Sequence, residues 1–191
     1  MTSVSEAEEV RRFWRDEVGR AGWFVTDPAV DAEIARRFGG LVERALVGDC
    51  AAWAATADGA LALLIVLDQF PRNLFRDGAK AFAGDALALE TAERAIEAGF
   101  DLEVAEPQRL FFYTPFEHAE DEAAQDRAVA LIGERLPGDR NAAHHAEQHR
   151  DLIRRFGRFP HRNAALGRAN TPEEDAHLAD GGYAPGARPA R

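Results

Sequence analysis

Apolar residues recur every three or four positions along almost the whole chain, which is the spacing of an α-helix with one buried face. The clearest apolar stripes are Val10, Phe13, Trp14 and Val18 in one segment and Ile34, Phe38, Leu41, Val42 and Ala45 in the next. Strands would instead need alternating apolar and polar residues, and the one candidate, Leu63–Leu67, belongs to a longer apolar run that favours helix. We therefore expect an all-α fold.

One segment of the chain is apolar on every side. Ala60–Leu67 is an unbroken apolar run, and Asp58 just before it is a suitable N-terminal cap for a helix. A helix without a polar face is buried among other helices, so we expect the central helix here. The run is far shorter than the roughly 20 residues that cross a bilayer, so no membrane partner is expected.

Proline, glycine and capping residues divide the rest of the chain into further helices. The expected boundaries are Ser5, Asp27-Pro28, Phe70-Pro71, Asp85, Gly99, Pro107, Asp121, Arg135, Asn141, Phe156 and the capping box Thr171-Pro172-Glu174, with a kink or break at Pro115. Helices joined by short loops pack as antiparallel neighbours, and we expect about seven to nine of them. They should form one domain over residues 5–178, followed by a flexible tail over residues 179–191.

Composition excludes several classes of protein. The chain of 191 residues has one cysteine, Cys50, and a formal net charge of -10 at pH 7. A single cysteine excludes an intramolecular disulfide and a cysteine-based zinc cluster, and an acidic chain is poorly suited to nucleic acid. The segment Met1–Val10 contains glutamates and no basic residue, unlike a secretory or mitochondrial presequence. We expect a cytoplasmic protein with no cofactor, no metal and no nucleic-acid partner, and the sequence leaves its oligomeric state open.

A short pattern occurs twice, as Phe70-Pro71-Arg72-Asn73 and as Phe159-Pro160-His161-Arg162-Asn163. Proline disfavours helix at the preceding residue, so we expect each pattern to be a corner that ends a helix, with its phenylalanine in the core. The second corner lies in a stretch, residues 140–168, where arginines outnumber acidic residues although the whole chain is acidic. Arginine offers a planar fork of donors that suits carboxylate and phosphate groups.

The two arginines of these corners, Arg72 and Arg162, have two possible roles. They could recognise an anion together with His161, or each could cap carbonyl groups at the end of a neighbouring helix. We expect the corners to meet, so that both arginines open into one depression that also contains His118 or His161. Two neighbouring guanidinium groups repel each other, so this arrangement needs a balancing carboxylate such as Asp68 or Glu117.

Histidines occur beside acidic residues in two further places. Glu117, His118 and Asp121 follow Pro115 closely, which suits proton transfer or a hard-metal site, although acidic residues also belong at the start of the next helix. His145 and His149 share one helix face, as zinc ligands do. Because His149 also lies on an apolar stripe, we favour a buried, hydrogen-bonded histidine there over a metal ligand.

Three separated motifs resemble a known family. They are Leu67-Asp68-Gln69-Phe70-Pro71-Arg72-Asn73, then Phe111-Phe112-Tyr113-Thr114-Pro115-Phe116-Glu117-His118, then the stretch from His149-Arg150-Asp151 to Leu166-Gly167-Arg168. In this order they are similar to the bacterial domain of unknown function 924 family, over about residues 10–178. The resemblance implies an all-helical fold of the tetratricopeptide-repeat-like superfamily, and it implies no established activity.

Two functions fit these observations. The first is a binding protein whose groove accepts an anionic small molecule or an acidic peptide, since helical-repeat folds form concave binding faces. The alternative is a hydrolase or transferase in which His118 or His161 is the general acid or base, while Arg72 and Arg162 hold an anionic substrate. In both cases the candidate site residues are Asp68, Arg72, Asn73, Glu117, His118, His161, Arg162 and Asn163.

Overall fold

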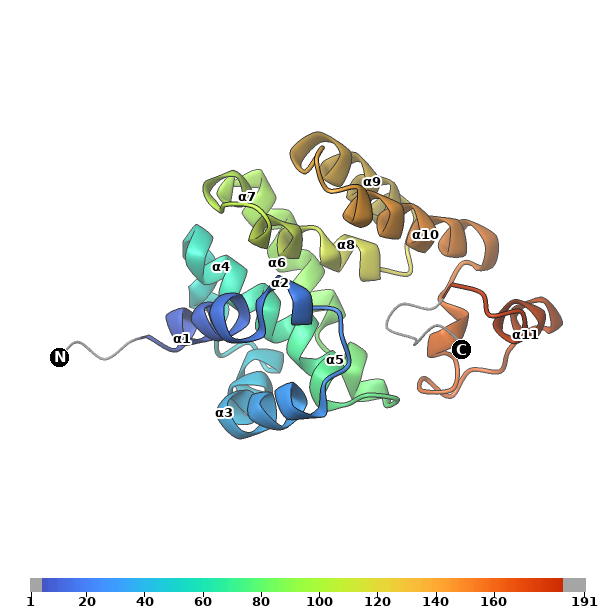
Figure 1. Cartoon of the computed structure of the whole chain (residues 1–191), viewed down its shortest axis with the longest axis horizontal. Helices are drawn as coiled ribbons and strands as arrows, with labels where there is room; N and C mark the ends of the chain where they lie inside the picture. The colour runs from blue at the N-terminus through green and yellow to red at the C-terminus, as the bar shows by residue number, and fades with distance from the viewer. Residues whose placement is uncertain (1–4, 184–191) are drawn as a thin grey trace.

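The regular elements of the protein are all helical in the computed structural model, which describes residues 5–183 (Figure 1). The α-helices are α1 (Glu6–Arg12), α2 (Gly19–Gly22), α3 (Pro28–Leu46), α4 (Ala57–Leu64), α5 (Phe70–Leu74), α6 (Asp85–Glu97), α7 (Phe100–Glu103), α8 (Thr114–His118), α9 (Glu122–Arg135), α10 (Arg140–Phe156) and α11 (Pro172–Ala179). Short 3-10 turns occur at Ala51–Ala55, Ala79–Phe82, Gln108–Phe112 and Pro160–Arg162, and π-helical segments at Phe13–Val18 and Ile65–Gln69. The all-α prediction is confirmed.

The apolar run Ala60–Leu67 forms the buried centre of the molecule, as predicted. It spans most of α4 and the start of the π-helical segment that follows. The predicted cap was wrong by two residues, because Thr56 caps α4 by accepting a hydrogen bond from the backbone N–H of Gly59 at 3.1 Å. Asp58 is instead mostly exposed and forms an ion pair with Arg11.

The central helix does not end at Phe70-Pro71, contrary to the sequence-based expectation. The backbone widens into the π-helical segment Ile65–Gln69, in which the N–H of Phe70 bonds to the carbonyl of Ile65, and then continues as α5. Pro71 lies in the first turn of α5, where a missing N–H costs little. The helix therefore continues past Pro71 by changing its hydrogen-bond register. The change occurs in the segment that contains the buried side chain of Asp68.

Most of the other helix boundaries agree with the expected ones. Asp27, Asp121 and Asp139 cap α3, α9 and α10 through their side chains, and Thr171 forms the predicted capping box of α11. The break expected at Pro115 is present, since the turn Gln108–Phe112 gives way to the short helix α8.

Two fully buried phenylalanines anchor the corners. Phe70 packs against the rings of Trp14 and Phe38, with centroid distances of 5.7 and 5.1 Å. Phe159 belongs to a smaller apolar cluster with Leu152 and Ile153. Both phenylalanines are completely shielded from solvent, as the sequence predicted.

Some helices that follow each other in the chain pack as neighbours, while α1 packs against α4 and α3 against α5. The longest such pair is α9 and α10, which are joined by a short loop and lie side by side in opposite directions (Figure 1). A tetratricopeptide-like array remains a prediction. Within residues 5–183 no helix has the length and apolar character needed to cross a membrane.

The end of the chain is only partly described. Tyr183 falls within the predicted flexible tail, yet its hydroxyl lies 2.8 Å from Nδ1 of His145 and its ring packs on the cluster around Phe159. The rest of the predicted tail, residues 184–191, lies outside the described residues, and the boundaries of the predicted domain remain a prediction.

The cap of α4 generates a first prediction. Thr56→Ala should lower the free energy of unfolding by about 1 kcal/mol, because it leaves the N–H of Gly59 without its partner. Asp58→Ala should cost less, because its ion pair is largely exposed. Urea unfolding measures both variants, and a larger loss in Asp58→Ala than in Thr56→Ala would contradict the observed cap.

Candidate functional site

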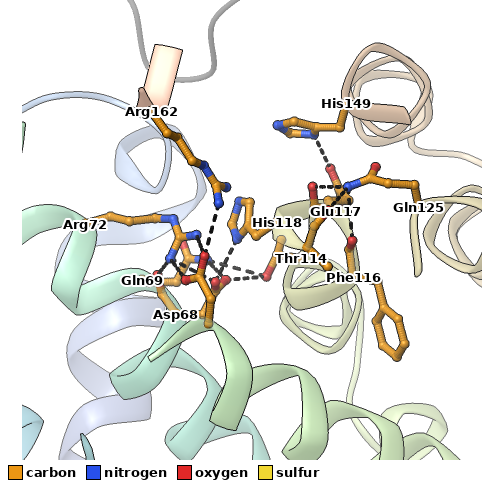
Figure 2. Close-up of polar contacts among 12 residues, drawn as sticks. Asp68, Gln69, Arg72, Thr114, Phe116, Glu117, His118, Gln125, His149 and Arg162 are labelled. Carbon is orange, nitrogen blue, oxygen red and sulfur yellow. Dashed lines mark hydrogen bonds and ion pairs between the residues drawn. The ribbon is translucent and has the colours of Figure 1, made fainter. Parts of the chain in front are cut away.

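Charged and polar side chains gather where the π-helical segment, α5, α6, α8 and α10 approach one another (Figure 2). Four of these ionisable side chains, Asp68, Glu117, His149 and Arg162, are buried. Burying an ionised group is costly unless it is paired and hydrogen-bonded. The partners of each group therefore show what holds this region together.

Asp68 forms the densest set of contacts. One carboxylate oxygen lies 2.7 Å from Nδ1 of His118 and 3.0 Å from Nη1 of Arg72. The other accepts hydrogen bonds from the Thr114 hydroxyl at 2.9 Å and the Gln69 amide at 2.6 Å. Burial alone would raise the pKa of Asp68, but the charge of Arg72 and the hydrogen bonds of His118 and Thr114 oppose burial and hold the pKa below its usual range. Asp68 is therefore an ionised carboxylate inside the protein.

Arg72 and Arg162 meet at Asp85, the first residue of α6. The two terminal nitrogens of Arg72 lie 2.9 and 3.0 Å from the two Asp85 oxygens, and Nη1 of Arg162 donates to Oδ2 at 3.2 Å. The two corners meet at one carboxylate, as predicted, and Asp68 is one of the balancing carboxylates. A depression into which both arginines open remains a prediction. Arg72 also donates to the backbone carbonyl of Asp68 at 2.6 Å, so it bonds to the backbone of the π-helical segment and bridges the two carboxylates at once.

The guanidinium group of Arg162 lies between two aromatic rings. Its central carbon is 4.6 Å from the centroid of Phe82 and 4.4 Å from that of Phe159. Burial, followed by the nearby charge of Arg72, lowers the pKa of Arg162 to about 10, so the side chain remains a cation at neutral pH. Among the described residues its Nε has no hydrogen-bond partner.

Gly84 allows α6 to bring Asp85 close to both arginines. A Cβ atom at this position would lie 2.1 Å from the carbonyl oxygen of Leu67, next to Asp68 in the chain. Real Cβ atoms do not approach a backbone oxygen so closely. The lack of a side chain at residue 84 is therefore what permits contact between the start of α6 and the π-helical segment.

His118 is oriented by Asp68. Because an ionised carboxylate only accepts hydrogen bonds, the contact with Nδ1 requires the ring proton on Nδ1 and leaves a lone pair on Nε2. Burial and the charge of Arg72 lower the pKa of His118, against the opposing effect of Asp68, so the ring is neutral. Its side chain is 14% exposed while that of Asp68 is 1% exposed, so the ring lies on the solvent side of the pair. No described residue is hydrogen-bonded to Nε2.

Glu117 and His149 form a second, more deeply buried pair. Oε2 of Glu117 lies 3.1 Å from Nδ1 of His149, and both side chains are 6% exposed. Burial raises the pKa of Glu117 to about 7, although His118 and His145 oppose the rise. Burial and the charge of Arg162 lower the pKa of His149 to about 3. Near neutral pH this pair therefore changes charge at the carboxyl group rather than at the ring.

The amide of Gln125 fixes the end of α8, which carries both Glu117 and His118. Its Nε2 donates to the carbonyl of Glu117 at 2.6 Å and to that of Ala119 at 2.8 Å. Figure 2 shows this amide reaching from α9 to the backbone of α8. The carbonyl groups that a helix leaves unpaired at its end are thereby satisfied, and the two functional side chains gain a fixed base.

The structure does not bring every predicted site residue to this cluster. Asn73 donates to Asp31 of α3 at 2.8 Å, and Asn163 bonds to Asn170 and accepts from Arg168, so both asparagines hold the corners in place. His161 does lie close to the cluster, with its ring centroid 5.5 Å from that of Phe159.

Sequence reasoning missed three residues of the cluster, Gln69, Asp85 and Thr114, and it did not predict that His149 contacts Glu117. Asp85 was correctly placed at the start of a helix, and this ordinary role for an acidic residue concealed its contact with the arginines. His149 was correctly expected to be buried and hydrogen-bonded. Within residues 5–183, no group of three or more His, Cys, Asp or Glu side chains is arranged to hold a metal ion.

Comparison with known proteins finds one family and one solved structure of high similarity. The model of a bacterial family of unknown function, DUF924, matches residues 10–182. The structure of a protein of unknown function from Agrobacterium tumefaciens is 45% identical in sequence, with a TM-score of 0.86, and the match covers 91% of this chain and 97% of that one. Comparison with curated proteins finds no match.

The close approach at residue 84 generates a second prediction. Gly84→Ala should lower the free energy of unfolding by about 1 to 3 kcal/mol, because the added methyl group forces α6 away from Leu67. Gly133→Ala is the matched control in α9, where an added Cβ meets nothing within 4 Å and alanine is the better helix former. Urea unfolding compares the two, and equal stability of both variants would mean that the contact does not constrain α6.

Proposed function

We propose that this chain, which belongs to the DUF924 family of bacterial proteins of unknown function, catalyses a reaction of an anionic small molecule. In this reaction His118 transfers protons as the general base. The observation that carries the proposal is the 2.7 Å contact between Asp68 and Nδ1 of His118. A buried, ionised carboxylate that orients a neutral imidazole leaves the opposite ring nitrogen free to accept a proton.

The chemistry of such a pair is a proton transfer that assists attack on the substrate. Nε2 of His118 would take a proton from a water molecule or a substrate hydroxyl group as its oxygen bonds to the reacting centre. The imidazolium that forms is stabilised by Asp68, and it can return the proton to the leaving group. Hydrolysis and group transfer both fit this series of steps. In hydrolysis the attacking species is water, and in group transfer it is a hydroxyl group.

Arg162 supplies the recognition of the substrate's charge. It keeps its positive charge while buried between two aromatic rings, and Asp85 contacts only Nη1 among its donors. Because its side chain is only 7% exposed, it suits a small anionic group better than a long acidic peptide. Arg72 is surrounded by Asp68 and Asp85, so its role is to hold these carboxylates in place.

Anion binding without a reaction is the second candidate. Arg162 lies between two aromatic rings, and its Nε has no hydrogen-bond partner among residues 5–183. Both observations favour anion binding, because a binding protein needs the arginine but not the proton carrier. We also propose that the protein is located in the cytoplasm and that its helices form a concave, repeat-like binding face.

A third prediction separates the two candidates. His118→Asn should lower the rate of hydrolysis of a chromogenic anionic substrate by about 100-fold or more, because it removes the proton acceptor. Suitable probes are 4-nitrophenyl phosphate and the mono-4-nitrophenyl ester of succinate. His144→Asn is the control, because His144 is an exposed histidine of α10.

Two outcomes would contradict the catalytic proposal. One is an equal rate in wild-type protein and His118→Asn. The other is wild-type turnover no faster than the buffer reaction with both probes while anions still raise the melting temperature. The second outcome would leave anion binding as the function, because a ligand stabilises a protein only by binding its native state.

A further inference from the structure

Three side chains that pack on Phe159 each have a buried nitrogen atom without a hydrogen-bond partner among the described residues. These atoms are Nε2 of His149, Nδ1 of His161 and Nε of Arg162. The His149 and His161 rings lie with their centroids 5.6 and 5.5 Å from that of Phe159, and the guanidinium carbon of Arg162 is 4.4 Å from it. Buried polar atoms in native proteins nearly always have a partner, so three unpaired nitrogens around one ring call for an explanation.

The orientation of His149 points to a ligand rather than to the protein. Its Nδ1 is taken up by Glu117, which leaves Nε2 as the nitrogen without a partner. Figure 2 shows the His149 ring extending from α10 toward the side on which Arg162 and His118 lie. The His118 and His149 rings are 5.9 Å apart, edge to face, so a group held by His149 would be next to the proposed base.

The charge of this region selects the kind of ligand. Arg162 is a cation, and a histidine nitrogen that carries its proton is a donor, so the unpaired atoms offer positive charge and N–H groups. Asp85 neutralises the arginines from its position at the start of α6, where it contacts Nη1 of Arg162. Phosphate and carboxylate groups are the ligands that complement such donors.

We propose that His149, His161 and Arg162 form an oxyanion subsite that holds the phosphate or carboxylate group of the substrate, and that Glu117 controls whether His149 donates to it. The proposal rests on the proposed function, because it assigns the substrate's anionic group to the site of the His118 base. It adds two histidines to the site, and it gives the Glu117–His149 pair a role.

Glu117 would determine which nitrogen of His149 carries the proton through the hydrogen bond between the two side chains. A protonated Glu117 donates to Nδ1, so the neutral ring carries its proton on Nε2 and donates to the anion. An ionised Glu117 accepts from Nδ1–H, and Nε2 then presents a lone pair that repels the anion. The pKa of Glu117, about 7, places this change at neutral pH.

Other charged groups also face this pair. Glu117 is faced by His118 of its own helix, by His145 and His149 of α10 and by Asp68 of the π-helical segment. His149 is also faced by Arg162 and Arg72, and its ring lies 5.4 Å from that of Tyr183. The lowered pKa of Asp68 and the basicity of the arginines keep the charges of these three groups constant between pH 6 and pH 8. His118 and His145 are the same in wild type and in Glu117→Gln, so a comparison of these two proteins isolates the contribution of Glu117.

Sulfate binding is the fourth prediction and the test of the subsite, because the charge of sulfate does not change between pH 6 and pH 8. By calorimetry, the wild-type affinity for sulfate should fall about tenfold from pH 6 to pH 8, in proportion to the fraction of protonated Glu117. In Glu117→Gln this tenfold fall should disappear, because the amide donates to Nδ1 at every pH. His149→Gln should lose about tenfold in affinity at pH 6, and the exposed control His144→Gln should not.

Two results would overturn the proposal: wild-type sulfate affinity in folded His149→Gln, or a wild-type pH profile in Glu117→Gln. If His149→Gln does not fold, His161→Gln takes its place, since it removes a second donor from a less buried position. The test is independent of catalysis, because His118→Asn should bind sulfate within about twofold of wild type while losing turnover. If the wild-type protein turns over neither probe while sulfate binding shows the predicted dependence on Glu117 and His149, the catalytic proposal alone has failed. If turnover depends on His118 while sulfate binding does not depend on His149, the subsite proposal alone has failed.

Discussion

The buried carboxylate of Asp68 is the charge on which the polar interior depends. An ion with 1% of its side chain exposed is tolerated only where several donors surround it, and here the donors come from His118, Thr114, Gln69 and Arg72. These donors belong to α5, α8 and the π-helical segment, so the carboxylate fixes the positions of these elements relative to one another. Asp85 extends the network by binding Arg72 and then Arg162 of the second corner. Segments nearly a hundred residues apart in the sequence are thereby joined through charge.

The same network separates two kinds of proton carrier. His118 rests on an ionised carboxylate and is the more exposed member of its pair, which suits a group that exchanges protons with a substrate. Glu117 has only a neutral histidine as its partner in a buried place, so its pKa rises to about 7. Two neighbouring residues of one short helix thus acquire opposite roles because one faces Asp68 and the other faces α10. Environments that give adjacent titratable groups different pKa values are typical of acid–base sites.

The sequence predicted the fold class and the meeting of the two corners, but not how the corners meet. Helical spacing and capping residues are local properties, so the all-α fold and boundaries such as Asp121 and Thr171 could be read from the chain. The π-helical register change before Pro71 could not, because it depends on how the apolar run packs on every side. Asp85 was missed because its contact with the arginines depends on the close approach at Gly84, which is a tertiary property. Asn73 was grouped with Arg72 by its place in the sequence, although the turn of α5 directs it to Asp31.

The protonation of the His118 ring tests the central claim most directly, because the account requires Asp68 to fix one tautomer. Long-range proton–nitrogen NMR of the wild-type protein at pH 7 should show His118 neutral, with a protonated Nδ1 and an unprotonated Nε2. In Asp68→Asn the ring should no longer be held in this single form, since an amide can donate as well as accept. A wild-type His118 that carries its proton on Nε2, or that is an imidazolium at pH 7, would contradict its assignment as the general base.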